Sequence, residues 1–156
     1  MEGRDERSLE QVYRSAVSGL YARIRNNYDF LYNRFGEEGI KIISEMSREY
    51  GLMVAERAKK RIKDNDLASV AQYLIRIFDT VGRGKEDKVI PIVWEQDRVV
   101  ITVGECPLHF TNPAMCRAHT TMERTVVETL NPKLTYRVGK SIPAGDTVCE
   151  HILGFK

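Results

Sequence analysis

Apolar residues recur every three or four positions through the first half of the chain, which is the pattern of amphipathic helices. The first predicted helix begins after Ser8, a residue suited to cap a helix start, and it ends at Gly36. Its apolar stripe carries four tyrosines, which favours a buried face with hydroxyl groups at the rim over an aromatic pocket. The stripe consists of Leu9, Val12, Tyr13, Ala16, Val17, Leu20, Tyr21, Ile24, Tyr28, Leu31, Tyr32 and Phe35.

Two further helices are predicted in this half. The second covers Glu37 to Lys63, and Gly51 in its middle allows a neighbouring helix to approach closely. Its predicted buried face consists of Ile40, Ile43, Met46, Tyr50, Met53, Val54, Ala58 and Ile62. The third helix is capped by Asp66. Its apolar positions are Leu67, Val70, Ala71, Leu74, Ile75, Phe78 and Val81.

The pattern changes to short β-branched segments after a loop that begins with Gly82-Arg83-Gly84. Lys88 to Trp94 and Arg98 to Val103 form a predicted hairpin, and Pro91 marks its first strand as an edge. The remaining predicted elements are a helix from Pro113 to Leu130 and strands from Lys133 to Val138 and from Thr147 to Phe155. This order predicts an α+β fold in which helices pack on one face of a twisted antiparallel sheet.

The composition fits one domain. The 156 residues are 42% apolar and 29% charged, which is ordinary usage for a chain with a single core. We therefore predict one domain over residues 1–156, with a disordered start at 1–7, a helical half at 8–82 and a strand-rich half at 88–156.

No apolar run reaches the ~20 residues that span a bilayer, and no signal-peptide core is present. We expect a cytoplasmic protein that does not engage membranes.

The net charge bears on the binding partners of the chain, and the cysteine count bears on its disulfides. The net charge of +2 is too small to indicate nucleic-acid binding. The basic run from Arg57 to Lys63 favours a solvated helix end over a patch for phosphate or anionic lipid. The chain has three cysteines, and an odd number disfavours a closed framework of disulfides.

All three cysteines and all three histidines fall between residues 106 and 151. The soft metal ligands and the proton carriers of the chain are thus gathered in one stretch. Cys116 and His119 lie three residues apart, on one face of the predicted helix. Cys149 and His151 lie two residues apart, on one side of the last predicted strand.

Three hypotheses follow from this spacing. The four residues could form a tetrahedral zinc site, with Cys106 or Glu123 able to replace one ligand. Alternatively, Cys116 or Cys149 could be a nucleophile with His151 or the helical histidine as its base. In the third hypothesis the cysteines and histidines are structural, because buried cysteine often behaves as a small hydrophobic residue.

The segments from Cys106-Pro107 through Cys116 to IPAGDTVCEH (Ile142 to His151) carry a family resemblance. This half resembles the V4R (4-vinyl reductase) domain and the related L-2-amino-thiazoline-4-carboxylic acid hydrolase-like proteins. Those families also end in a strand, a Gly-Asp turn and a cysteine followed by an acidic residue. The helical segment FGEEGIKIISEMSREYG (Phe35 to Gly51) is similar to the hydrolase-like group.

The resemblance implies an α+β fold shared with haem nitric-oxide sensors and a class of Golgi-transport subunits, with an apolar pocket between helices and sheet. V4R domains are regarded as binders of small hydrophobic or aromatic molecules. In aromatic-sensing activators they also hold a structural zinc with three cysteines and a glutamate. Cys116 and Cys149 match two of those ligands, whereas Ser141 and Val138 stand where that family has cysteine and glutamate. A zinc site in this chain would therefore need its two neighbouring histidines.

We therefore expect a domain that binds a small hydrophobic or aromatic ligand, with zinc as its candidate cofactor. One alternative is a small-molecule hydrolase that acts on a C–N or C–S bond through a Cys/His pair. Another is a ligand-free scaffold or dimerisation subunit. The wide apolar face of the first helix predicts a homodimer.

Overall fold

An antiparallel pair of helices begins the part of the chain that the computed structural model describes, which is residues 7–82 and 90–156. α1 (Leu9–Phe35) starts after Ser8, whose hydroxyl accepts a hydrogen bond of 3.2 Å from the amide of Gln11. Gly36 ends it with a φ of +57°, and α2 (Glu37–Lys59) follows at once. The sequence predicts both ends of α1 because the groups that set them are local. Apart from its last residue, the predicted disordered start lies outside the described residues.

α2 is shorter than predicted and ends at Lys59 rather than Lys63. The amide of Arg61 bonds to the carbonyl of Ala58, three residues earlier, at 2.8 Å, which is the tightening typical of a helix end. α3 (Leu67–Gly82) begins after Asp66. The carboxylate of Asp66 accepts a hydrogen bond of 2.7 Å from a first-turn amide, so the predicted cap is confirmed.

The helix predicted from Pro113 to Leu130 is two helices, α4 (Pro113–His119) and α5 (Thr121–Leu130). The residue between them, Thr120, has a ψ of 1°. The hydroxyls of Thr120 and Thr121 both donate to the carbonyl of Arg117, each at 3.3 Å. Such side-chain hydrogen bonds compete with those of the helix, so these two threonines explain the break that apolar periodicity did not show.

Within the described residues, the sheet is antiparallel, and its strands are β1 (Ile92–Trp94), β2 (Arg98–Val103), β3 (Leu134–Val138) and β4 (Cys149–Phe155). Their order is β1-β2-β4-β3, so β1 is an edge strand, as Pro91 predicts. β4 begins two residues later than predicted because the preceding chain forms a 3-10 turn (Ile142–Ala144) that Gly145 ends with a φ of +104°. β3 also starts one residue late, and the first strand starts at Ile92. Its predicted start at Lys88 and most of the loop before it lie outside the described residues.

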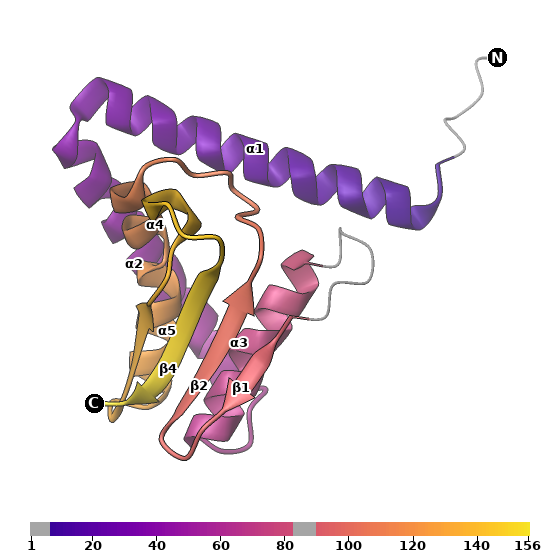
Figure 1. Cartoon of the computed structure of the whole chain (residues 1–156), viewed down its shortest axis with the longest axis vertical. Coiled ribbons are helices and arrows are strands. Elements are labelled where there is room, and N and C mark those ends of the chain that lie inside the picture. The colour runs from indigo at the N-terminus through magenta and orange to yellow at the C-terminus, as the bar shows by residue number, and fades with distance from the viewer. Residues whose placement is uncertain (1–6, 83–89) are drawn as a thin grey trace.

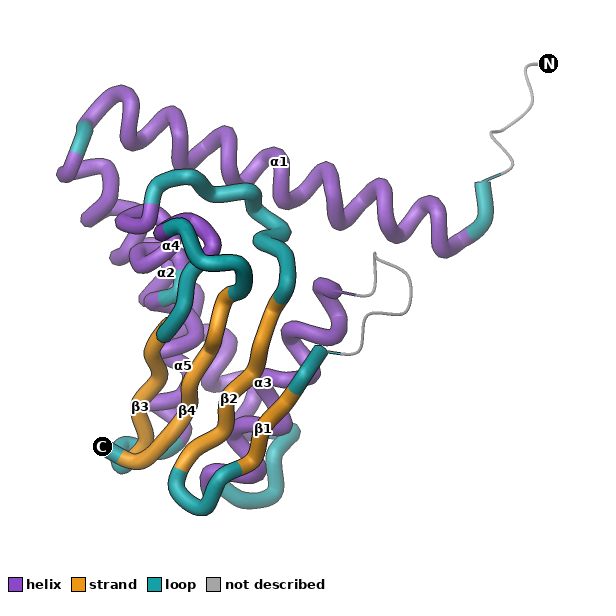
Figure 2. The backbone as a smooth tube through the Cα atoms, in the orientation of Figure 1, coloured by secondary structure: helices purple, strands orange, loops and turns teal. Residues whose placement is uncertain are grey.

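The helices pack on one face of the sheet, which confirms the predicted fold class. α3 and α5 cover that face, and α2 lies against α5 (Figures 1 and 2). Gly51 permits this close approach, since a Cβ atom there would lie only 2.8 Å from the carbonyl oxygen of Met122. α1 runs across one end of the sheet (Figure 1). Near its start, the hydroxyl of Tyr13 donates to the carbonyl of Thr80 in α3 at 2.6 Å.

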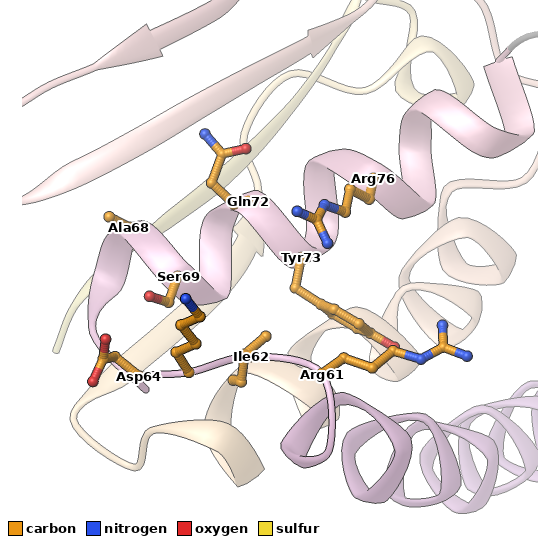
Figure 3. A pocket seen from close by; sticks show the side chains of 9 residues that line it. Arg61, Ile62, Asp64, Ala68, Ser69, Gln72, Tyr73 and Arg76 are labelled. Carbon is orange, nitrogen blue, oxygen red and sulfur yellow. The ribbon is translucent and has the colours of Figure 1, made fainter.

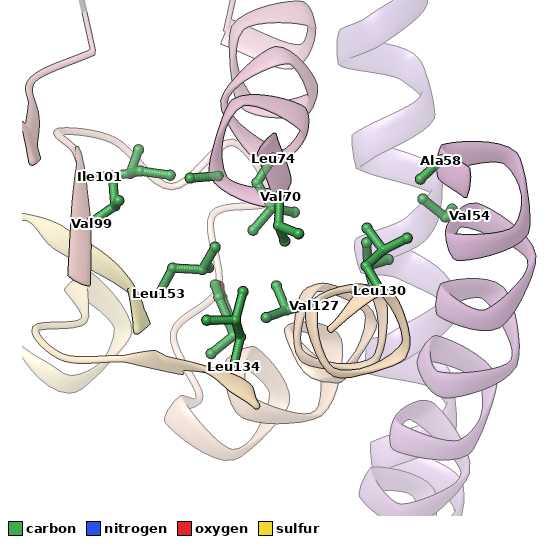
Figure 4. Close-up of a cluster of buried hydrophobic side chains, with 13 residues drawn as sticks. Val54, Ala58, Val70, Leu74, Val99, Ile101, Val127, Leu130, Leu134 and Leu153 are labelled. Atoms are coloured by element: carbon green, nitrogen blue, oxygen red, sulfur yellow. The ribbon is translucent and has the colours of Figure 1, made fainter. Parts of the chain in front are cut away.

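The larger apolar core lies between the sheet and α2, α3 and α5 (Figure 4), and we call it the sheet core. Aliphatic side chains make up almost all of it, and most are fully buried. Its buried members are Val54, Ala58, Val70, Ala71, Leu74, Val99, Ile101, Val126, Val127, Leu130, Leu134, Tyr136 and Leu153.

A second buried cluster lies where α1 crosses α4 and the loop before it, and we call it the α1 cluster. It differs in chemistry because it contains two aromatic rings and two sulfur atoms. Its buried members are Tyr28, Ile43, Leu108, Phe110, Met115, Cys116 and Ala118. Cys106 and several partly buried residues of α1 pack around it.

The predicted buried faces of α1 and α2 are only partly buried. Tyr28 is the buried residue of α1, whereas Leu20 is 62% exposed. In α2, the large apolar residues Met46, Tyr50 and Met53 face solvent. Close packing of two helices requires small side chains, and the buried positions of α2 include Ser47, Gly51, Ala55 and Ala58. None of the helices in the described ranges is long and apolar enough to cross a membrane.

Candidate functional site

The residues singled out in the sequence lie on the inner faces of α4 and β4. Cys116 of α4 is buried, and His119 is largely buried one turn further along. Cys149 and His151 both point to the helix-covered face of β4 and are buried. The predicted shared face of each pair is therefore confirmed. His109, the remaining histidine, is exposed and adopts a φ of 51°.

His119 is paired with a tyrosine of α1. Its Nδ1 shares a hydrogen bond of 3.1 Å with the hydroxyl of Tyr28. Phe110 packs edge-on against the imidazole, with ring centroids 5.6 Å apart, and stacks on Tyr28 at 6.0 Å. Burial lowers the pKa of His119 to about 4, so the ring is neutral at physiological pH.

His151 makes the equivalent pair with a tyrosine of the sheet. Its Nδ1 shares a hydrogen bond of 2.5 Å with the hydroxyl of Tyr136 on β3. Phe78 of α3 packs against the same imidazole at a centroid distance of 4.5 Å, with the two rings tilted by 47°. Burial, and to a smaller extent the nearby His119, lowers the pKa of His151 to about 4. This second imidazole is also neutral.

A buried carboxyl group lies near enough to the tyrosines of both pairs for its charge to raise their pKa. Glu123 of α5 is 6% exposed, and its Oε2 has no hydrogen-bond partner among the described residues. Burial raises the pKa of Glu123 to about 7. Its charge in turn raises the pKa of Tyr28 and Tyr136, although burial is the larger cause for both.

We call these five side chains the polar seam: Tyr28, His119, Glu123, Tyr136 and His151. The seam joins the α1 cluster to the sheet core, because Tyr28 belongs to the first and Tyr136 to the second. The sequence offered Glu123 as a substitute zinc ligand but gave no sign of the tyrosine partners. The pair of Tyr28 and His119 spans 91 positions of sequence, a separation that local patterns do not report.

Burial favours the protonated form of the Cys116 and Cys149 thiols. Burial raises the pKa of Cys116 to about 11, an effect that a hydrogen bond with the Ser141 side chain partly offsets. Burial also raises the pKa of Cys149, although its Sγ accepts a hydrogen bond of 3.2 Å from the amide of Ile142. Nucleophilic cysteines need a lowered pKa. The surroundings of Cys116 and Cys149 therefore resemble those of structural thiols.

The zinc hypothesis requires at least three suitable ligands around one point. Over residues 7–82 and 90–156, no three His, Cys, Asp or Glu side chains are grouped closely enough to hold a metal ion. The Nδ1 atoms of His119 and His151 are instead bonded to tyrosines. In this arrangement Cys116, His119, Cys149 and His151 do not fit a tetrahedral ligand set, and the zinc site stays a prediction.

Two surface depressions lie away from the seam. One has a volume of about 360 Å³ between the end of α2 and α3, and its lining includes Arg61, Lys63, Tyr73 and Arg76. Figure 3 shows Arg61 and Arg76 near the ring of Tyr73. The other, of about 660 Å³, covers the open face of the sheet and includes Arg137 among several charged side chains. Both have charged rims, so neither suits a hydrophobic ligand.

The fold defines a structural class, and comparison with known proteins adds no activity to it. The fold is that of an α+β domain with helices on one face of an antiparallel sheet. No protein-family model matches the chain. It is similar to an uncharacterized protein of Archaeoglobus fulgidus, with 26% identity over 132 residues that cover 76% of this chain. The match covers 59% of the length of that relative.

Proposed function

We propose that this domain binds a small hydrophobic or aromatic molecule at the polar seam, as a V4R-like or hydrolase-like ligand-binding module. The observation that carries the proposal is the buried seam itself. Polar groups placed in a core reduce stability unless all of their hydrogen bonds are made, and Glu123 Oε2 has no partner in the described chain. An apolar residue would serve stability better, so the carboxyl group fits a functional role.

The surroundings of the seam suit an aromatic guest. Tyr28, Phe110 and His119 present ring faces and edges to one another at centroid distances of 5.6 to 6.0 Å, and aromatic rings pack well in such offset geometries. Cys116 and Met115 add polarisable sulfur atoms beside them. Apolar walls with a few polar groups are typical of small-molecule sites.

α1 offers a route of entry. It covers the seam through its C-terminal part, around Tyr28, while most of its other residues are exposed. Few buried contacts hold its first half, apart from the bond between Tyr13 and Thr80. Elements with few buried contacts open at low free-energy cost. A ligand would therefore enter by displacing α1 from the loop around Leu108, to which Arg25 donates a hydrogen bond of 3.3 Å.

Thermal unfolding in the presence of toluene and p-cresol tests the proposal. A compound that binds the folded state at 100 times its Kd raises the melting temperature by roughly 5 °C or more. Phe110→Leu should weaken binding several-fold, because it removes an aromatic wall while keeping an apolar side chain. Ile101→Leu in the sheet core is the matched control and should bind as the wild type does. No shift with any such compound, together with no small molecule in solvent extracts of the purified protein, would sink the proposal.

The hydrolase alternative keeps Cys116, Cys149 and His151 as its candidate catalytic residues. No hydrogen bond joins either thiol to a histidine within the described residues, and the raised thiol pKa values weaken this reading. All three cysteines are free, which agrees with the cytoplasmic setting that we propose. A scaffold or homodimer role draws instead on the exposed apolar residues of α1.

A further inference from the structure

Glu123 contributes to the polar seam a fully buried oxygen atom that has no hydrogen-bond partner within the described structure. The two tyrosine hydroxyls are paired with the two imidazoles. Glu123 Oε2 has no partner among the described residues, and the residue is 6% exposed. A carboxyl oxygen buried in this way is left for a group that the chain itself does not supply.

No positive charge in the described structure compensates this carboxyl group. The titratable side chains whose pKa is raised by the charge of Glu123 are Tyr21 and Tyr28 of α1, Cys116 of α4 and Tyr136 of β3. Burial lowers the pKa of both histidines to about 4, so neither carries charge near neutral pH. A cationic side chain nearby would lower the pKa of Glu123, and none is among the causes that set it.

We infer that Glu123 anchors a small aromatic ligand that carries a positively charged nitrogen, such as an amidine or an amine. The inference rests on the proposed binding function and specifies its ligand. A cationic N–H group would pair with Oε2 through a charge-assisted hydrogen bond, which is stronger than a neutral one. A purely hydrocarbon ligand would leave the buried oxygen unpaired, at a cost in affinity.

The aromatic rings beside Glu123 favour the same ligand. Tyr28 and Phe110 lie stacked with an interplanar angle of 14°, and ring faces attract cations. The hydroxyls of Tyr28 and Tyr136 are already paired with histidines. Among the buried side-chain atoms of the seam, Glu123 Oε2 has no hydrogen-bond partner within the described residues, so it can discriminate between ligands.

Titration calorimetry with benzamidine and benzamide tests the inference, because the two compounds share a shape and differ in charge. At pH 8 we expect benzamidine to bind roughly tenfold or more tightly than benzamide. The carboxyl group must be ionised to pair with the amidinium. Since the pKa of Glu123 is about 7, benzamidine should bind about tenfold more weakly at pH 6 than at pH 8. Benzamide should show no such change.

Glu123→Gln should abolish the preference for benzamidine and its pH dependence while benzamide still binds, which also shows that the variant is folded. Glu128→Gln is the matched control, because Glu128 lies on the same helix but is already bonded to the Thr135 hydroxyl. Binding of benzamide and toluene without a preference for benzamidine would overturn the inference and leave the proposed function standing. A preference that survives in Glu123→Gln would also overturn it. Failure of all three compounds to bind the wild type would overturn both.

Discussion

The sheet core and the α1 cluster are both buried, but they are built from different chemistry. The sheet core is aliphatic apart from Tyr136, and its residues are almost completely enclosed. The α1 cluster has aromatic rings and sulfur atoms, and its members keep slightly more exposure. An aliphatic cluster contributes stability alone, whereas rings beside unpaired polar atoms can also recognise a ligand. The sheet core therefore stabilises the fold, whereas we expect the α1 cluster to take part in ligand binding.

The two clusters also differ in what covers them. The sheet core is enclosed by the sheet on one side and by packed helices on the other (Figure 4). One side of the α1 cluster is covered by α1, whose residues are exposed over most of its length. Local opening should therefore take place at α1 before it takes place at the sheet.

The largest effect is expected from truncation in the sheet core. Leu153, which is 0% exposed, should lose about 3–5 kcal/mol of unfolding free energy as Leu153→Ala, because a rigid surround leaves a cavity. Met115→Ala in the α1 cluster should cost less, about 2 kcal/mol, since α1 can move inward. Urea unfolding at constant pH measures both. Equal costs would mean that the two clusters are equally rigid.

The polar seam should make stability depend on pH in two opposite directions. The folded pKa of His119 and of His151 is about 4, below the ordinary 6.5, so their contribution to stability is lost as the pH falls from 6.5 to 4. The folded pKa of Glu123 is about 7, above the ordinary 4.5. Its contribution is present below pH 4.5 and is lost as the pH rises through 7.

Two histidines outweigh one glutamate between pH 4.5 and 6.5, so the wild type should lose stability on acidification. Glu123→Gln should steepen that loss, because the opposing group is gone. At pH 8 the same variant should be more stable than the wild type by up to about 3 kcal/mol, the equivalent of its pKa shift. Denaturant melts at pH 5, 6, 7 and 8 measure this. A variant with the wild-type profile would show that Glu123 is not buried as described.

A smaller effect is expected from the tyrosine hydroxyls. Tyr136→Phe should cost about 1–2 kcal/mol, because it leaves Nδ1 of His151 unpaired in a dry surround. Tyr28→Phe should cost about 1 kcal/mol or less, since Tyr28 is nearer to solvent. Urea unfolding gives both values, and NMR titration of each imidazole shows which ring has lost its partner. A larger cost for Tyr28→Phe than for Tyr136→Phe would mean that the pair of Tyr28 and His119, rather than the pair of Tyr136 and His151, is the more rigid one.

The sequence predicts features that neighbouring residues set. The Ser8 and Asp66 caps, the edge position of β1 and the inward faces of Cys149 and His151 all follow from local spacing. The sequence did not predict the break at Thr120, because apolar periodicity continues through it. The two adjacent threonines are a signal that could have shown it.

The sequence did not predict the polar seam, for a different reason. Its pairs join residues that are far apart in sequence, and no period relates Tyr28 to His119. Periodicity also marked α1 as buried over its whole length, because an apolar stripe looks the same whether or not a partner covers it.

The smallest effect on folding is expected from the same truncation on the open side of α1. Leu20 is 62% exposed, so Leu20→Ala should change the unfolding free energy of the dilute protein by no more than about 0.5 kcal/mol. This is far less than the loss of about 3–5 kcal/mol expected for Leu153→Ala. If α1 pairs with a second copy, as we propose for the homodimer, the variant should weaken self-association in sedimentation equilibrium. Its stability should then no longer rise with protein concentration as that of the wild type does. A large loss in dilute solution would mean that α1 is held to its own chain along its full length, and the seam would then lack the loosely held cover through which we expect a ligand to enter.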